Sequence, residues 1–153
     1  MDIISFLVSI LVGLITGFIS SWYVSKRFEQ KAAKEAQKTR FEDDKQQLKN
    51  FILHVFDELV LIEQGYDTSR LVWIIGGKPF CNSLYEARDR LKETDAVVLK
   101  QIDDTVEEIR EFCFIREVSQ ALSENEESQI IQWTNALPVL ARKVQFISNP
   151  SES

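Results

Sequence analysis

The chain has 153 residues, about the size of one domain, with 27% charged and 44% hydrophobic residues. Five Gly and three Pro residues are too few for a disordered or low-complexity chain. One histidine and two cysteines exclude most metal sites and catalytic triads. The formal net charge is −6, but residues 3–25 carry no charge, so the chain divides into an apolar segment and a highly charged remainder.

The uncharged segment, residues 3–25, has the length and composition of a membrane-spanning helix. At about 1.5 Å per residue, residues 3–24 reach roughly 33 Å, and the hydrocarbon core of a bilayer is about 30 Å thick. A buried helix of a soluble domain rarely runs this long without a charge. A cleaved signal peptide would begin with basic residues, whereas Asp2 precedes the segment here. The sequence therefore predicts a retained transmembrane helix.

The residues that flank this segment predict its orientation. Lys26 and Arg27 follow it directly, so the positive-inside rule places the N-terminus outside and the rest of the chain in the cytoplasm. Trp22 and Tyr23 occupy the positions of an aromatic belt at the inner interface. We therefore expect a single-pass protein of the inner cell membrane, with these four residues at the membrane interface.

Small residues recur at every fourth position of the apolar segment. Such a row lets two helix backbones approach closely, and this close approach drives the association of helices in lipid. The alternative interpretation is that Gly and Ser are simply frequent in membrane helices, but six of them in phase favour self-association into a homo-oligomer. The predicted oligomerisation residues are Ser5, Ser9, Gly13, Gly17, Ser21 and Ser25.

Residues 26–47 form a predicted helical stalk. They are rich in Lys, Glu, Gln, Ala and Arg and contain neither Gly nor Pro, so the apolar helix is expected to continue through them. Pairs such as Lys31 and Glu35, four residues apart, support this helix. The basic residues of the stalk could attract anionic lipid headgroups, but we favour a simple solvated helix.

Residues 48–148 predict a helical bundle in the cytoplasm, and residues 149–153 a tail. Apolar residues from Leu48 to Val60 follow the helical period, and Gly65 supplies a stop. Residues 71–75 fit either a helix or a strand, and we favour a helix because no partner strand is evident. Residues 76–79, Gly-Gly-Lys-Pro, predict a loop. In a reducing cytoplasm the two cysteines, Cys81 and Cys113, are expected to be free thiols buried as small hydrophobes.

Capping boxes predict where the later helices begin. Ser83 and Glu86 predict the start of a long helix with a break near Thr94–Asp95, and Ser123 and Glu126 predict the start of another. The last predicted helix contains Pro138, where we expect a kink. The predicted fold class is therefore all-α: a single-pass transmembrane helix, a helical stalk and a bundle of four to five helices.

No residue pattern predicts catalysis, and no cofactor or metal is expected. His54 lies among apolar helix positions, which is typical of a packing residue rather than a general base. The carboxylates at 103, 104, 107, 108 and 111 lack the His partners of a di-iron site, so they predict a solvated or partner-facing acidic surface. From residue 51 onward, ten basic and eighteen acidic residues give a net charge of −8, which disfavours nucleic-acid binding.

These observations predict a non-enzymatic membrane protein that self-associates through its small-residue row and presents the bundle to a cytoplasmic protein partner. The alternative is an oligomeric pore-forming effector of the prokaryotic defence or toxin type, whose first helices line a channel. This alternative rests on similarity of layout alone, without a matching motif.

Overall fold

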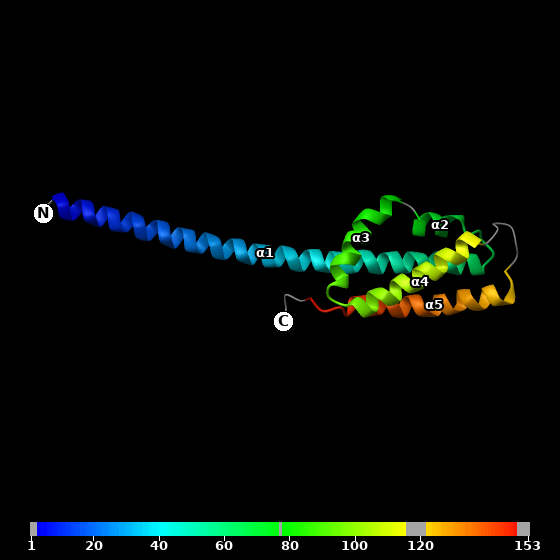
Figure 1. Cartoon of the computed structure of the whole chain (residues 1–153). Coiled ribbons are helices and arrows are strands. Elements are labelled where there is room, and N and C mark those ends of the chain that lie inside the picture. The colour runs from blue at the N-terminus through cyan, green and yellow to red at the C-terminus, as the bar shows by residue number, and fades with distance from the viewer. Residues whose placement is uncertain (1–2, 77, 116–121, 150–153) are drawn as a thin grey trace. The chain divides into compact units, whose positions relative to one another are not determined.

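Every regular element in the residues that the computed structural model describes is a helix, and those residues contain no strand. The backbone is described for residues 3–76, 78–115 and 122–149, and the side chains for residues 13–76, 84–115 and 122–149. Within these ranges, five helices follow one another (Figure 1). The chain divides into two compact units, residues 1–39 and 40–153. The predicted all-α fold with a helical bundle is therefore confirmed.

Helix α1 (Ile3–Glu63) joins the predicted apolar segment, the stalk and the first bundle helix into one element. It ends at the predicted glycine: Gly65 has a φ of 93°, a left-handed conformation in which a Cβ is unfavourable. The Gly65 amide donates to the carbonyl of Ile62 at 2.9 Å, and the Tyr66 amide donates to that of Leu61 at 3.1 Å. These two bonds form a Schellman motif, which satisfies carbonyls at the end of the helix.

The described part of α1 contradicts the predicted localisation. Among the residues that the structure describes, no helical stretch is both long and apolar enough to cross a membrane. The prediction of a single-pass protein of the inner membrane, with its N-terminus outside, is therefore wrong.

Helix α2 (Ser69–Gly76) resolves the ambiguous segment 71–75 as a helix, as we favoured. The carboxylate of Asp67 accepts a 2.6 Å hydrogen bond from the Ser69 amide and satisfies a free donor at the helix start. This bond lowers the pKa of Asp67 below its ordinary value. Leu71 and Ile74 are buried, and these two residues attach α2 to the core.

Helix α3 (Lys78–Lys92) begins earlier than the sequence predicted. The expected start at Ser83 is wrong, because this residue lies within α3, and its side chain is outside the described residues. The expected loop at 76–79 is also wrong in extent, since α2 ends at Gly76 and α3 starts at Lys78. Pro79 is compatible with a helix here because the first turn needs no amide donor.

Helices α4 (Ala96–Ile115) and α5 (Glu124–Gln145) begin where local signals place them. The predicted break at Thr94–Asp95 separates α3 from α4, and the Asp95 carboxylate accepts a 3.1 Å hydrogen bond from the Val98 amide. The capping box of Ser123 and Glu126 is present at the start of α5, which continues through Pro138. In both helices the start is determined by residues within one turn of the N-terminus.

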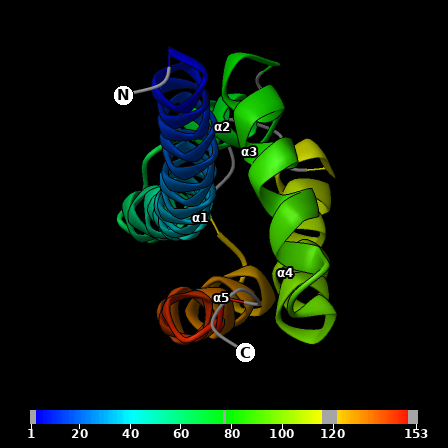
Figure 2. The same cartoon turned by 90° about the vertical axis from the view of Figure 1, so that its left-hand side faces the viewer.

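One apolar core lies among the helices of the second unit. Helix α4 packs against α2, α3 and α5, and Figure 2 shows it beside α3 and α5. The half of α1 that begins at Arg40 contributes a buried stripe at alternating spacings of three and four residues from Leu48 onward, typical of a helix with one buried face. The buried residues of α1 are Phe41, Leu48, Ile52, Val55, Leu59 and Ile62.

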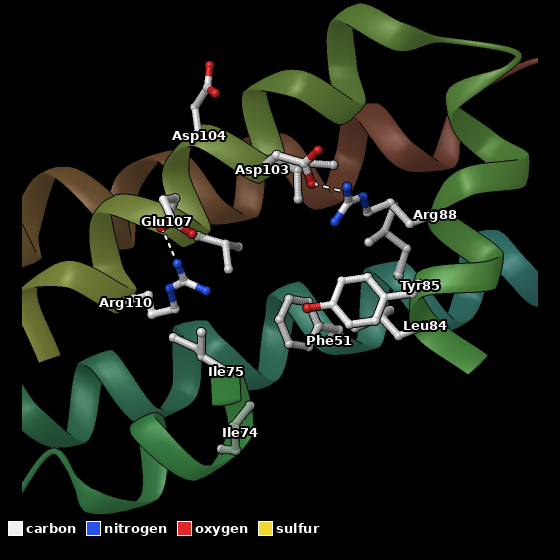
Figure 3. Close-up of a pocket in the computed structure, with 13 residues that line it drawn as sticks. Phe51, Ile74, Ile75, Leu84, Tyr85, Arg88, Asp103, Asp104, Glu107 and Arg110 are labelled. Atoms are coloured by element: carbon white, nitrogen blue, oxygen red, sulfur yellow. Dashed lines mark hydrogen bonds and ion pairs between the residues drawn. The ribbon is translucent and has the colours of Figure 1, made fainter. Parts of the chain in front are cut away.

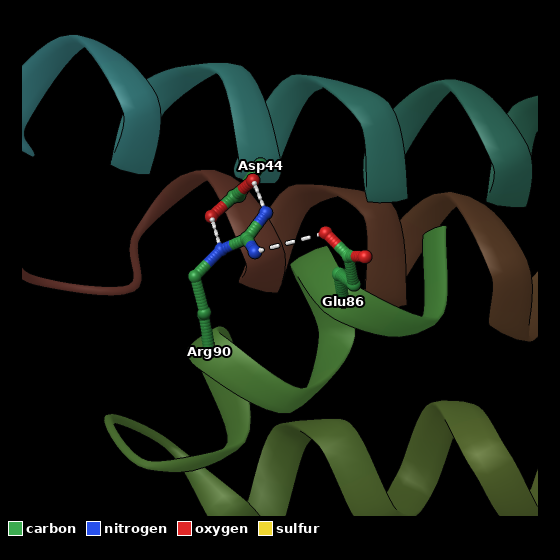
Figure 4. A network of polar contacts seen from close by, with 3 residues as sticks. All are labelled: Asp44, Glu86 and Arg90. Atoms are coloured by element: carbon green, nitrogen blue, oxygen red, sulfur yellow. Dashed lines mark hydrogen bonds and ion pairs between the residues drawn. The ribbon is translucent and has the colours of Figure 1, made fainter. Parts of the chain in front are cut away.

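Two buried carboxylates of α1 connect it to its neighbours. Asp44 accepts two 2.7 Å hydrogen bonds from the guanidinium of Arg90 on α3, and Glu86 lies 3.5 Å from the same group (Figure 4). Glu58 lies 3.3 Å from a guanidinium nitrogen of Arg70 on α2. A buried carboxylate is stable only when it is paired, so these contacts fix how α2 and α3 are placed on α1.

Candidate functional site

Two surfaces of the protein have the features of binding sites, and the first is the exposed part of α1. Of the six predicted oligomerisation residues, Gly13, Gly17, Ser21 and Ser25 are exposed on α1, whereas the side chains of Ser5 and Ser9 lie outside the described residues. A Cβ built at Gly13 or at Gly17 meets nothing within 4 Å. The glycines therefore leave open space beside the helix rather than accommodating another part of the same chain.

Large apolar side chains cover the rest of this helical segment. Each of them exposes half of its surface or more, and Leu14, Phe18 and Phe28 expose 69–76%, so packing within the chain covers little of them. A contiguous apolar surface of this kind marks an interaction site, because leaving it in water is costly. The apolar segment of α1, as we call it from here, consists of Leu14, Ile15, Phe18, Ile19, Trp22, Tyr23, Val24 and Phe28.

The residues predicted for the membrane interface contact one another along the helix. The ammonium of Lys26 lies 5.0 Å from the ring centre of Trp22, and the guanidinium of Arg27 lies 4.8 Å from that of Tyr23. Both pairs are four residues apart, so the helix brings them together on one face. These cation–π contacts account for the order of the aromatic and basic residues.

The second site is a cavity of about 340 Å³ within the bundle, lined by residues of α1, α2, α3 and α4. Its apolar part includes Phe51, Ile75 and Leu84, which pack against the core without being fully buried. Figure 3 shows charged side chains of α3 and α4 along the opposite part of the wall. The complete lining consists of Leu48, Phe51, Ile74, Ile75, Leu84, Tyr85, Arg88, Ile102, Asp103, Asp104, Val106, Glu107 and Arg110.

The cations of the cavity wall have acidic neighbours. Nε of Arg88 lies 3.2 Å from a carboxylate oxygen of Asp103, and Arg110 forms an ion pair with Glu107 one turn away (Figure 3). Burial raises the pKa of Asp103, while the charge of Arg88 opposes that rise.

The cavity was not predicted, although the acidic cluster of α4 that contributes to its wall was identified in the sequence. The acidic cluster of α4 was predicted to be a solvated or partner-facing surface, and Asp104, Glu107, Glu108 and Glu111 are exposed. Asp103 is half-buried, and both it and Glu107 line the cavity and pair with arginines. Glu108 accepts a 3.2 Å hydrogen bond from the Trp133 indole. Within the described ranges, no group of three His, Cys, Asp or Glu side chains is placed to hold a metal ion. Arg88 gave no signal in the sequence, because its acidic neighbour Asp103 lies on another helix and is recognisable only after folding. Arg110 lies one turn from Glu107 on the same helix, so the sequence already indicated that it neutralises part of the cluster.

The remaining candidate residues occupy ordinary structural positions. His54 is half-buried on α1 and lines a shallow surface cavity with Asn50 and Asp57. Cys113 is buried at 4% exposure in the core, as predicted for a small hydrophobe, and Cys81 lies outside the residues with described side chains. Neither His54 nor Cys113 lines the cavity among α1, α2, α3 and α4.

Comparison with protein-family models, with curated proteins and with solved structures found no match. The functional interpretation therefore depends on the residues of the two sites.

Proposed function

We propose that this protein is a non-enzymatic self-associating protein whose copies join through the apolar segment of α1 and whose bundle is presented to a protein partner. The observation that carries the proposal is the exposure of that segment: Phe18, for example, is 76% exposed and Trp22 is 58% exposed. Each large apolar side chain gains on the order of 1.5–3 kcal/mol on full burial. A second copy of the same segment supplies a surface of matching chemistry.

The small-residue row favours a second copy of this chain as the binding partner. Gly13 and Gly17 are one turn apart with open space around them, so a second helix can approach the backbone closely at this point. Ser21 and Ser25 continue the row along the exposed helix. The larger apolar side chains on either side can then pack across the pair of helices. Self-complementary surfaces of this kind give closed symmetric oligomers.

The polar contacts of the bundle favour a role in binding a protein partner rather than in catalysis. Its strongest polar contacts, such as the pair of Asp44 and Arg90, connect helices within the fold. Its acidic balance, −8 from residue 51 onward, favours a partner with a basic surface. The alternative of a pore-forming oligomer stays a prediction, and no observation among the described residues favours it.

The first test is the mass of the particle. Light scattering in a mild non-ionic detergent, which limits non-specific aggregation, should give a defined oligomer for the wild type. Gly13→Leu/Gly17→Leu should lower that mass by at least one subunit, because two isobutyl groups would fill the space where the helices approach.

A matched control introduces two leucines at the same spacing elsewhere on α1. Ala32 and Ala36 are also four residues apart and exposed, but they lie outside the apolar segment. Ala32→Leu/Ala36→Leu should therefore leave the mass unchanged. A monomeric wild type, or an equal effect of the two double variants, would contradict the proposal.

A further inference from the structure

A row of basic residues follows one face of α1 from the end of the apolar segment onward. Its four residues are spaced by four, three and four positions, and all of them are exposed. At about 100° per residue they fall within an arc of about 60°, and at about 1.5 Å per residue they extend over about 17 Å. The basic stripe, as we call this row, consists of Arg27, Lys31, Lys34 and Lys38.

The basic stripe belongs to a part of α1 with an excess of positive charge. Residues 26–39 contain five basic and two acidic residues, a net charge of +3. The ammonium of Lys31 lies 4.0 Å from a carboxylate oxygen of Glu35, but both side chains are more than 70% exposed. An ion pair in water contributes little, so either partner can exchange it for another contact. The stripe therefore presents a positive face to an acidic surface.

The basic stripe faces away from the small-residue row where the two meet along the chain. Ser25 is the last residue of the row, and Arg27 lies about 200° further around the helix. Lys34 lies about 180° from Ser25 by the same count. A second helix packed against the row at Ser25 would therefore leave the stripe accessible.

The bundle of the same chain carries the complementary charge. From residue 51 onward, ten basic and eighteen acidic residues give a net charge of −8. Exposed carboxylates occur on α3, α4 and α5, for example those of Asp89, Asp104 and Glu124. Surfaces of opposite charge attract each other and guide association. A chain that carries both surfaces can join other copies head to tail, each stripe against the bundle of the next copy.

We propose that the basic stripe binds the acidic bundle of a second copy of this chain. The proposal rests on the proposed function in taking the bundle as the surface that binds a protein partner, and it identifies that partner as another copy. The contact uses residues outside the small-residue row. It therefore links copies in addition to their association through the apolar segment.

Light scattering of the full chain at two salt concentrations separates the two contacts. Charges are screened beyond about 10 Å in 0.1 M salt and beyond about 3 Å in 1 M salt, so the stripe should release the bundle in 1 M sodium chloride. We expect the particle mass in 0.1 M salt to be at least about twice that in 1 M salt. Equal masses would overturn the proposal. A monomer in 1 M salt whose mass still rises in 0.1 M salt would contradict association through the apolar segment alone.

Neutral substitutions test whether the stripe is the binding surface. Arg27→Gln/Lys31→Gln/Lys34→Gln/Lys38→Gln removes four charges and keeps good helix formers. In 0.1 M salt this variant should have the mass that the wild type has in 1 M salt. Lys31→Arg/Lys34→Arg/Lys38→Arg preserves the charges and should behave as the wild type does. A glutamine variant that kept the salt-dependent mass would overturn the proposal.

A matched control removes the same number of exposed cations from the bundle. Lys92→Gln/Lys100→Gln/Arg142→Gln/Lys143→Gln should keep the larger mass in 0.1 M salt, because it leaves both the stripe and the acidic residues in place. An equal loss in the control and in the stripe variant would show that total charge controls the mass, and it would overturn the proposal. Far-UV circular dichroism should show the wild-type helical content in every variant.

Nuclease treatment distinguishes a second copy from nucleic acid, which also binds basic surfaces in a salt-dependent way. The larger mass of the wild type in 0.1 M salt should survive the treatment. Its loss would show that nucleic acid occupies the stripe, and the proposed contact between copies would be overturned.

Discussion

The two parts of α1 use apolar residues in opposite ways, although they belong to one continuous helix. Before Arg40 every described side chain is exposed, including Ile19 at 57%. From Phe41 onward the helix has a buried face, on which Ile52 is fully buried. Both parts are helical because both contain good helix-forming residues and few breakers. The comparison shows that helix formation and burial are separate events, since burial requires other helices to pack against the apolar face.

The largest expected difference between the two parts concerns core packing. Ile52→Ala should lower the free energy of unfolding by about 2–5 kcal/mol, because it leaves a cavity among packed helices. Ile19→Ala, the same change on the exposed part, should alter the stability of the bundle by less than about 0.5 kcal/mol. Denaturant titration followed by far-UV circular dichroism measures both. Similar losses in the two variants would show that the apolar segment is already covered within the chain.

A smaller difference is expected for the ion pairs. Asp44 is 2% exposed and holds Arg90 through two hydrogen bonds, so Asp44→Asn should cost about 2 kcal/mol. The pair of Lys31 and Glu35 is 4.0 Å apart with both side chains more than 70% exposed, so Glu35→Gln should cost less than about 0.5 kcal/mol. The same denaturant titrations measure these costs. If Asp44→Asn left the free energy of unfolding unchanged, the Asp44–Arg90 pair would not be the contact that positions α3.

The smallest expected effect is on the pH dependence of stability. Because burial raises the pKa of Asp103 above its ordinary value of 3.8, the folded state binds a proton at pH values where the unfolded state has lost it. The stability contributed by this proton is fully present below pH 3.8 and is lost as the pH rises through the raised pKa. Asp103→Asn should therefore remove a decrease in stability between pH 3.8 and neutrality.

The adjacent residue provides a second variant for this titration. The charge of Asp104 contributes to the raised pKa of Asp103, so Asp104→Asn should lessen the decrease in stability without removing it. Unfolding free energies measured from pH 3.5 to 7 would show the difference between the two variants. A profile of Asp103→Asn that overlaid the wild-type profile would argue that the cavity wall is well hydrated.

Local signals in the sequence predicted much of the helical structure. Gly65 ends α1, Asp95 caps α4, and Ser123 begins α5, each through contacts within one turn. The start of α3 was misplaced because Ser83 and Glu86 match a capping box in the sequence, whereas α3 already begins at Lys78. A short motif can be satisfied in several ways, and packing decides among them.

The candidate sites were predictable to different extents. The exposed row with Gly13 and Gly17 follows from residue spacing along one helix, so the sequence was sufficient to locate it. Its assignment to a membrane-spanning helix was wrong, because no helix among the described residues is both long and apolar enough to cross a membrane. The cavity was not predictable, since Phe51 and Arg88 come from helices whose relative placement depends on the whole bundle.

The sequence by itself determined that this protein is helical, where most of its helices end, and that one segment carries apolar and small residues without charge. These properties depend on backbone propensity and on contacts within a few residues. The tertiary structure alone decided which apolar residues are buried, that Asp44 meets Arg90 across 46 positions of sequence, and that a cavity lies among four helices. These properties depend on the packing of distant segments, whose free energy is shared among many contacts and is not encoded in any single motif.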